Sequence, residues 1–166
     1  QYFITHGREW ERYAWIKARA ITGQGGRRQE LEKLVRPFVF RKYLDYATLG
    51  AMRQLHAEVR RDVARRELAE HVKLGPGGIR EIEFVVQALQ LARAGRDPEL
   101  TARPTLKVLA LLGERTLLPA RAVEELGAAY TFLRNVEHRL QYLDDAQRHD
   151  LPQDAEDQAR LARMSG

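Results

Sequence analysis

The sequence predicts an all-α protein, a multi-helix domain that resembles a bundle. Apolar residues recur every three or four positions along almost the whole chain, while the alternation typical of strands is nearly absent. Glycines and prolines fall between these periodic segments, where helices begin or end. The chain has 166 residues, of which 44% are hydrophobic and 31% charged, a balance that suits a folded domain and excludes a disordered or fibrous protein.

The first half of the chain predicts three helices. One covers residues 8–21 and ends before a cluster of glycines, and a second covers residues 28–36 and ends or bends at Pro37. The segment 38–40 fits either an extended piece or a helical turn. A long helix over residues 46–66 follows, and its outer face carries Arg53, Arg60, Arg61, Arg65 and Arg66. Such a run is typical of a solvated helix face, or of a surface that faces phosphate.

The second half predicts further helices, each with a recognisable start. The glycine-rich loop 74–78 opens directly into a helix over residues 79–94. Pro104 stands where a first helical residue would, and the longest helix, 119–144, also begins with a proline. A last polar helix covers residues 153–164. We expect residues 1–166 to form a single helical domain, a fragment of something larger, that could be subdivided into basic helices (1–72) and a loop with a helical bundle (73–166).

Charge and composition exclude several classes of protein. The net charge is +5, but residues 1–66 carry 15 Lys and Arg against 7 Asp and Glu, whereas residues 67–166 carry 13 against 16. The basic first part suggests contact with phosphate or another acidic surface, although the excess is too small to indicate nucleic acid. The absence of cysteine excludes disulfide scaffolds, thiolate zinc sites and cysteine nucleophiles. No apolar run could cross a membrane and no signal peptide opens the chain, so we expect a cytoplasmic protein with no membrane contact.

The loop Gly75-Pro76-Gly77-Gly78 is the most suggestive local feature. Flexible residues before a helix can leave its first N–H groups free for an anion, and Lys73 and Arg80 flank the loop. The loop matches neither the P-loop nor the dinucleotide-binding pattern. A tight turn without any ligand therefore remains open.

Two carboxylates follow the loop, and two cations lie on the first predicted helix. Glu81 and Glu83 point about 200° apart on a helix, so they cannot share one metal ion. They stabilise the helix dipole, or one of them, with Glu83 favoured, faces inward and needs a basic partner. Lys17 and Arg19 could grip a phosphate or form surface salt bridges. The histidines show no metal-binding spacing.

Four segments, in a fixed order along the chain, form distinctive sequence motifs. They are Gly7–Arg19 (GREWERYAWIKAR), Arg36–Asp45 (RPFVFRKYLD), Lys73–Phe84 (KLGPGGIREIEF) and Tyr130–Gln141 (YTFLRNVEHRLQ), continued by Asp145-Ala146-Gln147 and Leu151-Pro152. Together they resemble the glutamine synthetase adenylyltransferase family, also called the adenylyl-removing enzymes, over nearly the whole chain. Arg148 and Asp150 depart from the family, since relatives often have threonine at these positions.

The resemblance implies one part of a long polypeptide with two nucleotidyltransferase units. The N-terminal unit of that family removes AMP from a tyrosine of glutamine synthetase by phosphorolysis, and the C-terminal unit adds AMP from ATP. The loop 73–84 resembles the N-terminal, deadenylylating half. The chain is then the helical part beside a nucleotidyltransferase core whose magnesium-binding carboxylates precede Gln1. We expect no catalytic residue, no metal ligand and no activity in the chain alone.

The resemblance also implies a set of site residues. Lys17, Arg19, Lys73, Gly77, Gly78 and Arg80 are expected to face the nucleotide or its phosphates. Glu83 is expected to orient one of these cations, with Glu81 in a supporting role. The parent enzyme would use Mg²⁺ and ATP, ADP or phosphate, none of which we expect on the fragment alone. The implied protein partners are glutamine synthetase and the PII signal protein.

Two alternatives stay open. The helical region of a PII uridylyltransferase is the nearest relative, although its downstream HD-type metal motifs and sensing domains are not visible here. A non-catalytic helical module that binds nucleic acid or protein is the other, motivated by the arginine face on residues 53–66. The sequence has no helix-turn-helix pattern and no aromatic stacking platform that would support nucleic-acid binding.

Overall fold

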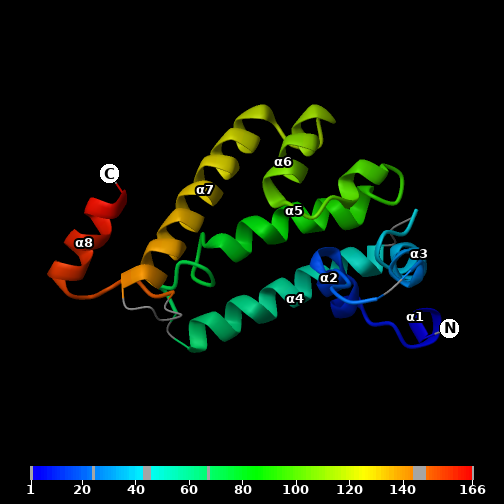
Figure 1. Cartoon of the computed structure of the whole chain (residues 1–166), viewed down its shortest axis with the longest axis horizontal. Helices are drawn as coiled ribbons and strands as arrows, with labels where there is room; N and C mark the ends of the chain where they lie inside the picture. The colour runs from blue at the N-terminus through cyan, green and yellow to red at the C-terminus, as the bar shows by residue number, and fades with distance from the viewer. Residues whose placement is uncertain (1, 24, 43–45, 67, 144–148, 166) are drawn as a thin grey trace. The chain divides into compact units, whose positions relative to one another are not determined.

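The computed structural model describes residues 2–23, 25–42, 46–66, 68–143 and 149–165 (Figure 1). Its elements are α1 (Tyr2–Thr5), α2 (Glu9–Lys17), α3 (Arg27–Val39), α4 (Tyr46–Arg65), α5 (Ile79–Arg93), the 3₁₀ helix η1 (Pro98–Thr101), α6 (Thr105–Glu114), α7 (Ala120–Leu143) and α8 (Ala155–Ser165). Within the described residues the only β-type pairing is an isolated bridge between His71 and Asp150. The predicted all-α class is confirmed.

The first long helix is shorter than predicted. The sequence predicts a helix to Ile21, but α2 ends at Lys17 and Ala18 is extended (φ −65°, ψ 147°). The carbonyl groups beyond this point accept hydrogen bonds from distant arginines instead of helical amides. Arg103 Nε donates to the Ala18 carbonyl (3.0 Å) and Arg28 Nε to the Ala20 carbonyl (3.0 Å). Tertiary contacts therefore end the helix before the glycines do.

The second helix runs further than predicted, through Pro37 to Val39. Proline removes only one N–H bond this close to a helix end, and the Phe40 N–H still donates to the Arg36 carbonyl (2.9 Å). Phe38 is buried and its ring stacks on Phe3 with centroids 4.9 Å apart. Burial of Phe38 and Val39 on the helical face decides the ambiguity over residues 38–40 in favour of a helix for the first two.

The chain packs as two compact units. Unit 1 comprises residues 1–56 and 85–118, and unit 2 comprises residues 57–84 and 119–166. Two of the three boundaries fall inside helices, α4 and α5, so each of these helices contributes to both units. The subdivision expected at residue 72 stays a prediction.

In unit 1, buried polar side chains tie loops to helices. Arg12 is fully buried, and its Nε donates to the Phe38 carbonyl (2.9 Å), which joins α2 to α3. Gln90 of α5 is also fully buried and donates to the carbonyls of Leu100 (2.7 Å) and Ala102 (2.8 Å) on either side of the end of η1. The apolar core of this unit includes Ile16, Val35, Val39, Leu91, Leu100, Val108, Leu109 and Leu112.

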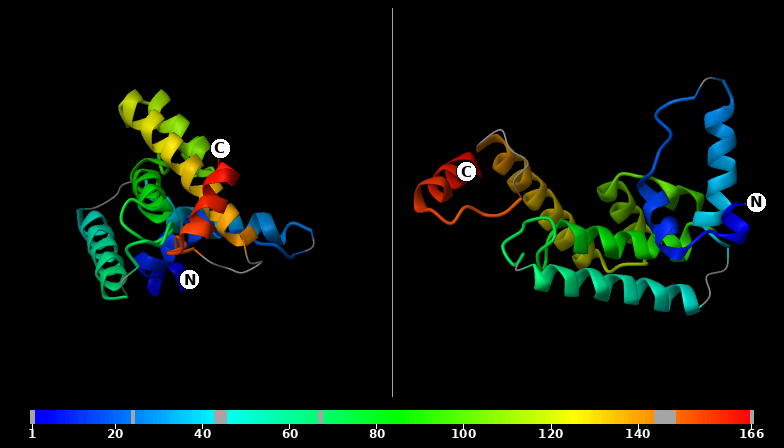
Figure 2. Two further views of the ribbon diagram at one scale, coloured as in Figure 1. Left: turned by 90° about the vertical axis from the view of Figure 1, so that its left-hand side faces the viewer. Right: turned by 90° about the horizontal axis from the view of Figure 1, so that it is seen from below.

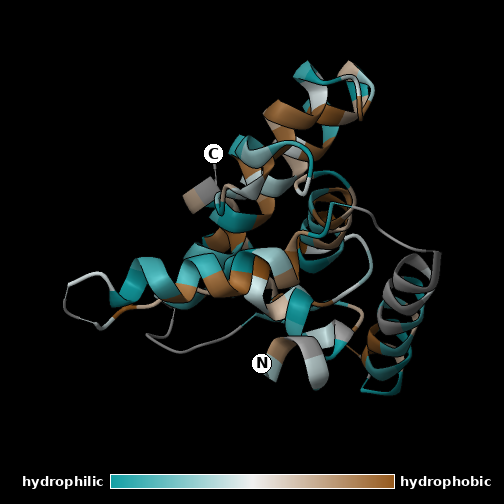
Figure 3. Cartoon of the chain, turned by 90° about the vertical axis from the view of Figure 1, so that its right-hand side faces the viewer, coloured by the Kyte–Doolittle hydropathy of each residue, from teal (hydrophilic) through white to brown (hydrophobic). Residues whose placement is uncertain are grey.

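In unit 2, one apolar cluster joins the glycine-rich segment to the last two helices. It contains Val72, Ile79, Val136, Leu140 and Leu161, with Tyr130 and Leu133 packed against it. α8 turns back and packs on α7 (Figure 2). The helical ribbons carry both hydrophobic and hydrophilic residues, as expected for helices that bury one face (Figure 3). Among the described residues no helix has the length and apolarity needed to cross a membrane.

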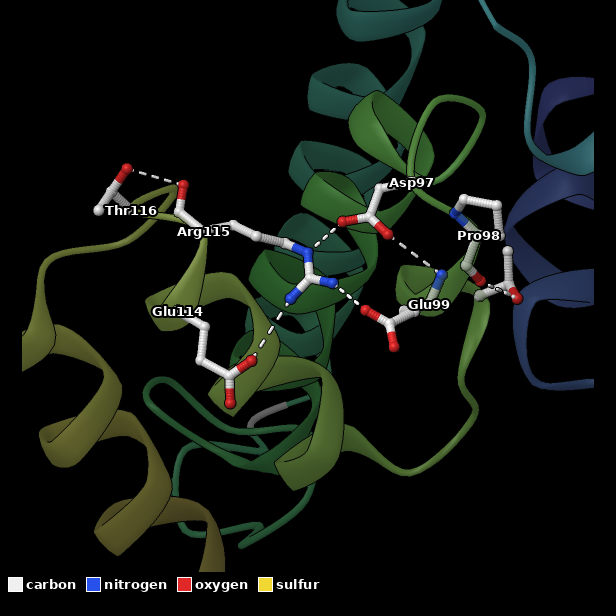
Figure 4. A network of polar contacts seen from close by, with 7 residues as sticks. Asp97, Pro98, Glu99, Glu114, Arg115 and Thr116 are labelled. Carbon is white, nitrogen blue, oxygen red and sulfur yellow. Dashed lines mark hydrogen bonds and ion pairs between the residues drawn. The ribbon is translucent and has the colours of Figure 1, made fainter.

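A polar network fixes the end of α6 against the turn after α5 (Figure 4). Arg115 donates to the carboxylates of Asp97 and Glu99, and its Nη1 lies 3.4 Å from Glu114 Oε2. Hydrogen bonding to Asp97 is the main reason that the pKa of Arg115 is raised. Asp97 also accepts from the Glu99 N–H (3.2 Å) at the start of η1. One guanidinium thus separates carboxylates that would otherwise repel one another.

This network predicts that Arg115→Met lowers the thermal denaturation midpoint, because Asp97, Glu99 and Glu114 would lose their shared cation. Arg121→Met is the matched control, since Arg121 is 87% exposed and, among the residues described, pairs with Glu125 alone, four residues along the same helix. Its midpoint should stay at the wild-type value. Equal midpoints for the two variants, measured by circular dichroism, would contradict the assigned role of Arg115.

Candidate functional site

The glycine-rich loop of unit 2 needs glycine for reasons of backbone geometry. A Cβ on Gly78 would lie 2.7 Å from the Val72 carbonyl oxygen, and one on Gly75 would lie 2.7 Å from the His71 carbonyl oxygen. Both neighbours are backbone atoms, which cannot rotate away. Gly77 has open space around it but a φ of +72°, which other residues rarely adopt. The close approach of the chain to itself explains this cluster of glycines.

The amides at the start of α5 already have partners within the chain. Gly77 donates to Glu81 Oε2 (3.1 Å), Gly78 to the Gly75 carbonyl (2.9 Å), Ile79 to the Val72 carbonyl (3.2 Å) and Arg80 to the Lys73 carbonyl (3.0 Å). An anion at this helix start would have to displace these bonds. The positive charge that the loop offers a ligand therefore comes from side chains.

Among the described residues of unit 2, the most buried charged side chain is that of Glu137 on α7, which is 3% exposed. Its Oε1 lies 3.7 Å from Lys73 Nζ and 3.3 Å from His149 Nδ1, while its Oε2 accepts a hydrogen bond from Arg134. A buried carboxylate is stable only when basic groups compensate for the loss of water. Glu137 thus holds together the loop, α7 and the segment that follows α7.

Two histidines complete this cluster. His71 Nδ1 accepts hydrogen bonds from the N–H groups of Lys73 (3.2 Å) and Leu74 (3.1 Å), so that nitrogen carries no proton. Its ring stacks on His149 with centroids 5.2 Å apart and planes 19° apart. The Val72 N–H donates to the His149 carbonyl (2.8 Å). These contacts hold Lys73 in one place relative to Glu137.

The two carboxylates after the loop have separate partners. Glu81 lies 3.4 Å from Arg60 of the α4 arginine run and accepts from the Gly77 N–H, which suits its expected place in the first turn. Glu83 is half-buried and accepts a hydrogen bond from the Tyr130 hydroxyl (3.2 Å). The carboxylate beside Lys73 is Glu137 rather than Glu83. Arg80 is exposed, and no ion pair of its side chain occurs in the part of the chain described.

The other two predicted cations lie in unit 1. Lys17 Nζ donates to the Arg103 carbonyl and to Thr105 Oγ1 (3.0 Å), which ties the end of α2 to the start of α6. Arg19 lines a pocket of about 380 Å³ that includes the apolar side chains of Trp15 and Val35. Further basic residues on its wall are Lys33, Arg36 and Arg103. Lys17 therefore has a structural role that connects α2 to α6, whereas Arg19 lines a pocket.

The structure therefore brings the predicted site residues together in two groups. Lys73, Gly77, Gly78, Arg80, Glu81 and Glu83 lie in unit 2, and Lys17 and Arg19 lie in unit 1. Across the described ranges, no group of three or more metal-ligating side chains is close enough to hold a metal ion. The described residues therefore supply no ready-made set of ligands for magnesium. Asp145, Ala146, Gln147 and Arg148 lie outside the described residues.

The sequence indicates a partly buried polar patch on α7 around Arg134 and Glu137, but it does not show that Glu137 contacts Lys73 and His149. The helical spacing nevertheless contains an indication, because Tyr130, Leu133, Glu137 and Leu140 fall at intervals of three and four on one face of α7. A lone carboxylate on an apolar face demands basic partners. The spacing indicates one such partner, Arg134, three residues earlier on the same helix, but it does not identify Lys73 and His149.

Comparison with known proteins places this arrangement in a family. Residues 51–166 match the family model of the GlnD PII-uridylyltransferase. The chain belongs to the GlnD PII-uridylyltransferase family. Every residue of unit 2, and hence the Glu137 cluster, lies inside the matched part.

Several relatives of this chain carry a more specific name, bifunctional glutamine synthetase adenylyltransferase/adenylyl-removing enzyme. The protein of Aromatoleum aromaticum is 62% identical over 98% of this chain, that of Nitrosomonas europaea is 58% identical over 99%, and that of Ralstonia nicotianae is 51% identical over 100%. The resemblance seen in the sequence is confirmed. The chain spans 17% to 20% of the length of these three relatives.

The loop geometry predicts that Gly78→Ala destabilises this GlnD-family domain by about 1–3 kcal/mol, the usual cost of forcing an atom into a packed site. Gly50→Ala is the matched control, because Gly50 lies inside α4 with open space around it. That variant should gain up to about 1 kcal/mol, since alanine favours a helix. Urea denaturation measures both, and a Gly78→Ala protein as stable as wild type would refute the steric argument.

Proposed function

We propose that this chain is the helical part of the deadenylylating half of a bifunctional glutamine synthetase adenylyltransferase/adenylyl-removing enzyme. The observation that carries the proposal is 62% identity over 98% of the chain to a relative of that name. The sequence motif of residues 73–84 supports assignment of the chain to the deadenylylating half. The protein partners would be glutamine synthetase, as substrate, and the PII signal protein, as regulator.

The reaction proposed for the parent enzyme is phosphorolysis of a tyrosyl–AMP bond. An oxygen of inorganic phosphate attacks the phosphorus of AMP, the bond from phosphorus to the tyrosine oxygen breaks, and that oxygen takes up a proton. The products are ADP and the free tyrosine. Two negatively charged phosphate groups must approach each other, so fixed cations lower the barrier by electrostatic stabilisation.

The role of this chain would be to supply such cations. Lys73 and Arg80 in unit 2, and Lys17 and Arg19 in unit 1, are the proposed phosphate-binding side chains. Gly77 and Gly78 would shape the turn that carries them, and Glu81 and Glu83 would support it. The parent enzyme would use Mg²⁺ with ATP, ADP or phosphate. Because the described residues do not fit a metal site, we assign no step on them to magnesium.

A second candidate function has one observation in its favour. The matching family model describes a PII uridylyltransferase, in which the corresponding region would assist transfer of UMP rather than AMP. The two functions differ in the protein modified and in the nucleotide. Parallel assays with adenylylated glutamine synthetase and with PII plus UTP distinguish them.

The proposal predicts activity in the whole enzyme and none in this chain alone. ADP release from adenylylated glutamine synthetase and phosphate is the measurement, made on the chain and on a protein extended upstream through the nucleotidyltransferase core. Release by the longer protein only is the expected result. Addition of AMP from ATP by the longer protein would instead assign the chain to the other half of the enzyme.

The proposed phosphate contact of Arg80 predicts that Arg80→Glu in the whole enzyme lowers the rate of deadenylylation by about tenfold or more, as expected for loss of a charged hydrogen bond. Arg93→Glu is the control, because Arg93 is an exposed cation at the other end of the same helix. That variant should keep the wild-type rate. Wild-type activity of Arg80→Glu would remove Arg80 from the site.

A further inference from the structure

The cluster around Glu137 contains more positive than negative charge. Within the described part of unit 2, a single carboxylate faces Lys73 and Arg134, with the His149 ring as a third basic group. Lysine and arginine are both charged at neutral pH, so the cluster keeps at least one net positive charge. A structural ion pair needs only one cation for one carboxylate, and the excess remains to be explained.

The two cations also keep access to solvent. The side chain of Lys73 is 37% exposed and that of Arg134 is 38% exposed, whereas Glu137 is 3% exposed. The carboxylate therefore lies beneath the two basic groups. Arg134 uses Nη1 toward Glu137, and its other donors have no partner among the residues described. Arginine presents donors in a planar fork that suits phosphate oxygens.

The two oxygens of the Glu137 carboxylate contact different cations. Oε1 faces Lys73 and Oε2 faces Arg134, so the carboxylate holds both groups side by side on the surface. Lys73 comes from the loop and Arg134 from the middle of α7, 61 positions further along the chain. Without the shared carboxylate the two like charges would repel each other.

We propose that Arg134 is a further phosphate-binding residue, paired with Lys73, and that Glu137 is the positioning residue for both. The inference rests on the proposed function, because it takes Lys73 as a phosphate-binding cation. The ligand is an oxygen of phosphate, contacted by one lysine and one arginine. Glu137 does not touch the ligand and acts only through the cations above it.

The test uses the whole enzyme and measures the KM for inorganic phosphate, kcat and the thermal midpoint. Lys73→Met, Arg134→Met and Glu137→Gln should each raise the KM for phosphate by about tenfold or more, the factor for one charged hydrogen bond. Glu137→Gln added to a protein that already carries Lys73→Met and Arg134→Met should raise it no further, since both cations that Glu137 positions are then absent. Glu137→Asp, which keeps the carboxylate, should raise the KM for phosphate less than Glu137→Gln does.

Matched controls lie on the same helix. Arg121 and Glu125 form an ion pair near the start of α7, with side chains 87% and 63% exposed. Arg121→Met and Glu125→Gln change the same kinds of charge as Arg134→Met and Glu137→Gln. Both should keep the wild-type KM for phosphate.

The outcomes separate this inference from the function on which it rests. A raised KM in Lys73→Met, with a wild-type KM in Arg134→Met and in Glu137→Gln, would overturn the inference and leave the proposed function standing. The Glu137→Gln variant would then show only a lowered thermal midpoint, as expected if Glu137 contributes to stability and not to phosphate binding. A wild-type KM in Lys73→Met would overturn the inference and the proposed role of Lys73 together. If Glu137→Gln does not fold, Glu137→Asp and Arg134→Met decide the question by the same criterion.

Discussion

Burial of the Glu137 carboxylate is the constraint on which unit 2 depends. A carboxylate at 3% exposure requires basic partners around it, and here they come from the glycine-rich loop, from α7 itself and from the segment after α7. Two of these segments, the residues just before the loop and the segment after α7, are also joined by backbone hydrogen bonds on either side of His71 and His149. One charge thus links parts of the chain that are far apart in the sequence. The apolar cluster of Val72, Val136 and Leu140 adjoins these residues and adds the hydrophobic part of the stabilisation.

The glycine-rich loop illustrates how one pattern can serve two purposes. Glycines before a helix often leave amides free to bind an anion. Here Gly75 and Gly78 are required by contacts with backbone oxygens, and the amides from Gly77 to Arg80 donate within the chain. The proposed contribution of the loop to ligand binding is the placement of Lys73 and Arg80. Backbone geometry and side-chain charge are therefore separate properties of this loop.

Much of the fold could be predicted from periodicity. The helices over residues 46–65, 79–93 and 120–143 lie within one residue of their expected bounds at every end, because long amphipathic segments bounded by glycine or proline are easily identified. The errors fall at ends decided by distant contacts. α2 ends early where Arg28 and Arg103 bind its following carbonyls, and α3 continues past Pro37 because Phe38 and Val39 are buried. The short helices α1 and η1 were not predicted, since four residues are too few to reveal a helical repeat of apolar positions.

The sequence by itself determined the helical class, the order of the long helices and the resemblance to the adenylyltransferase family, because periodicity and ordered motifs are properties of the linear chain. It also identified Lys73 and Arg80 as cations beside the loop. Only the tertiary structure decided which carboxylate faces Lys73, since Glu137 is 64 positions away and Glu83 is ten. Likewise only the folded chain decided that Lys17 is tied to Arg103 and Thr105 while Arg19 lines a pocket. Spacing along one helix predicts a shared face, whereas contact between distant segments depends on how their buried faces pack.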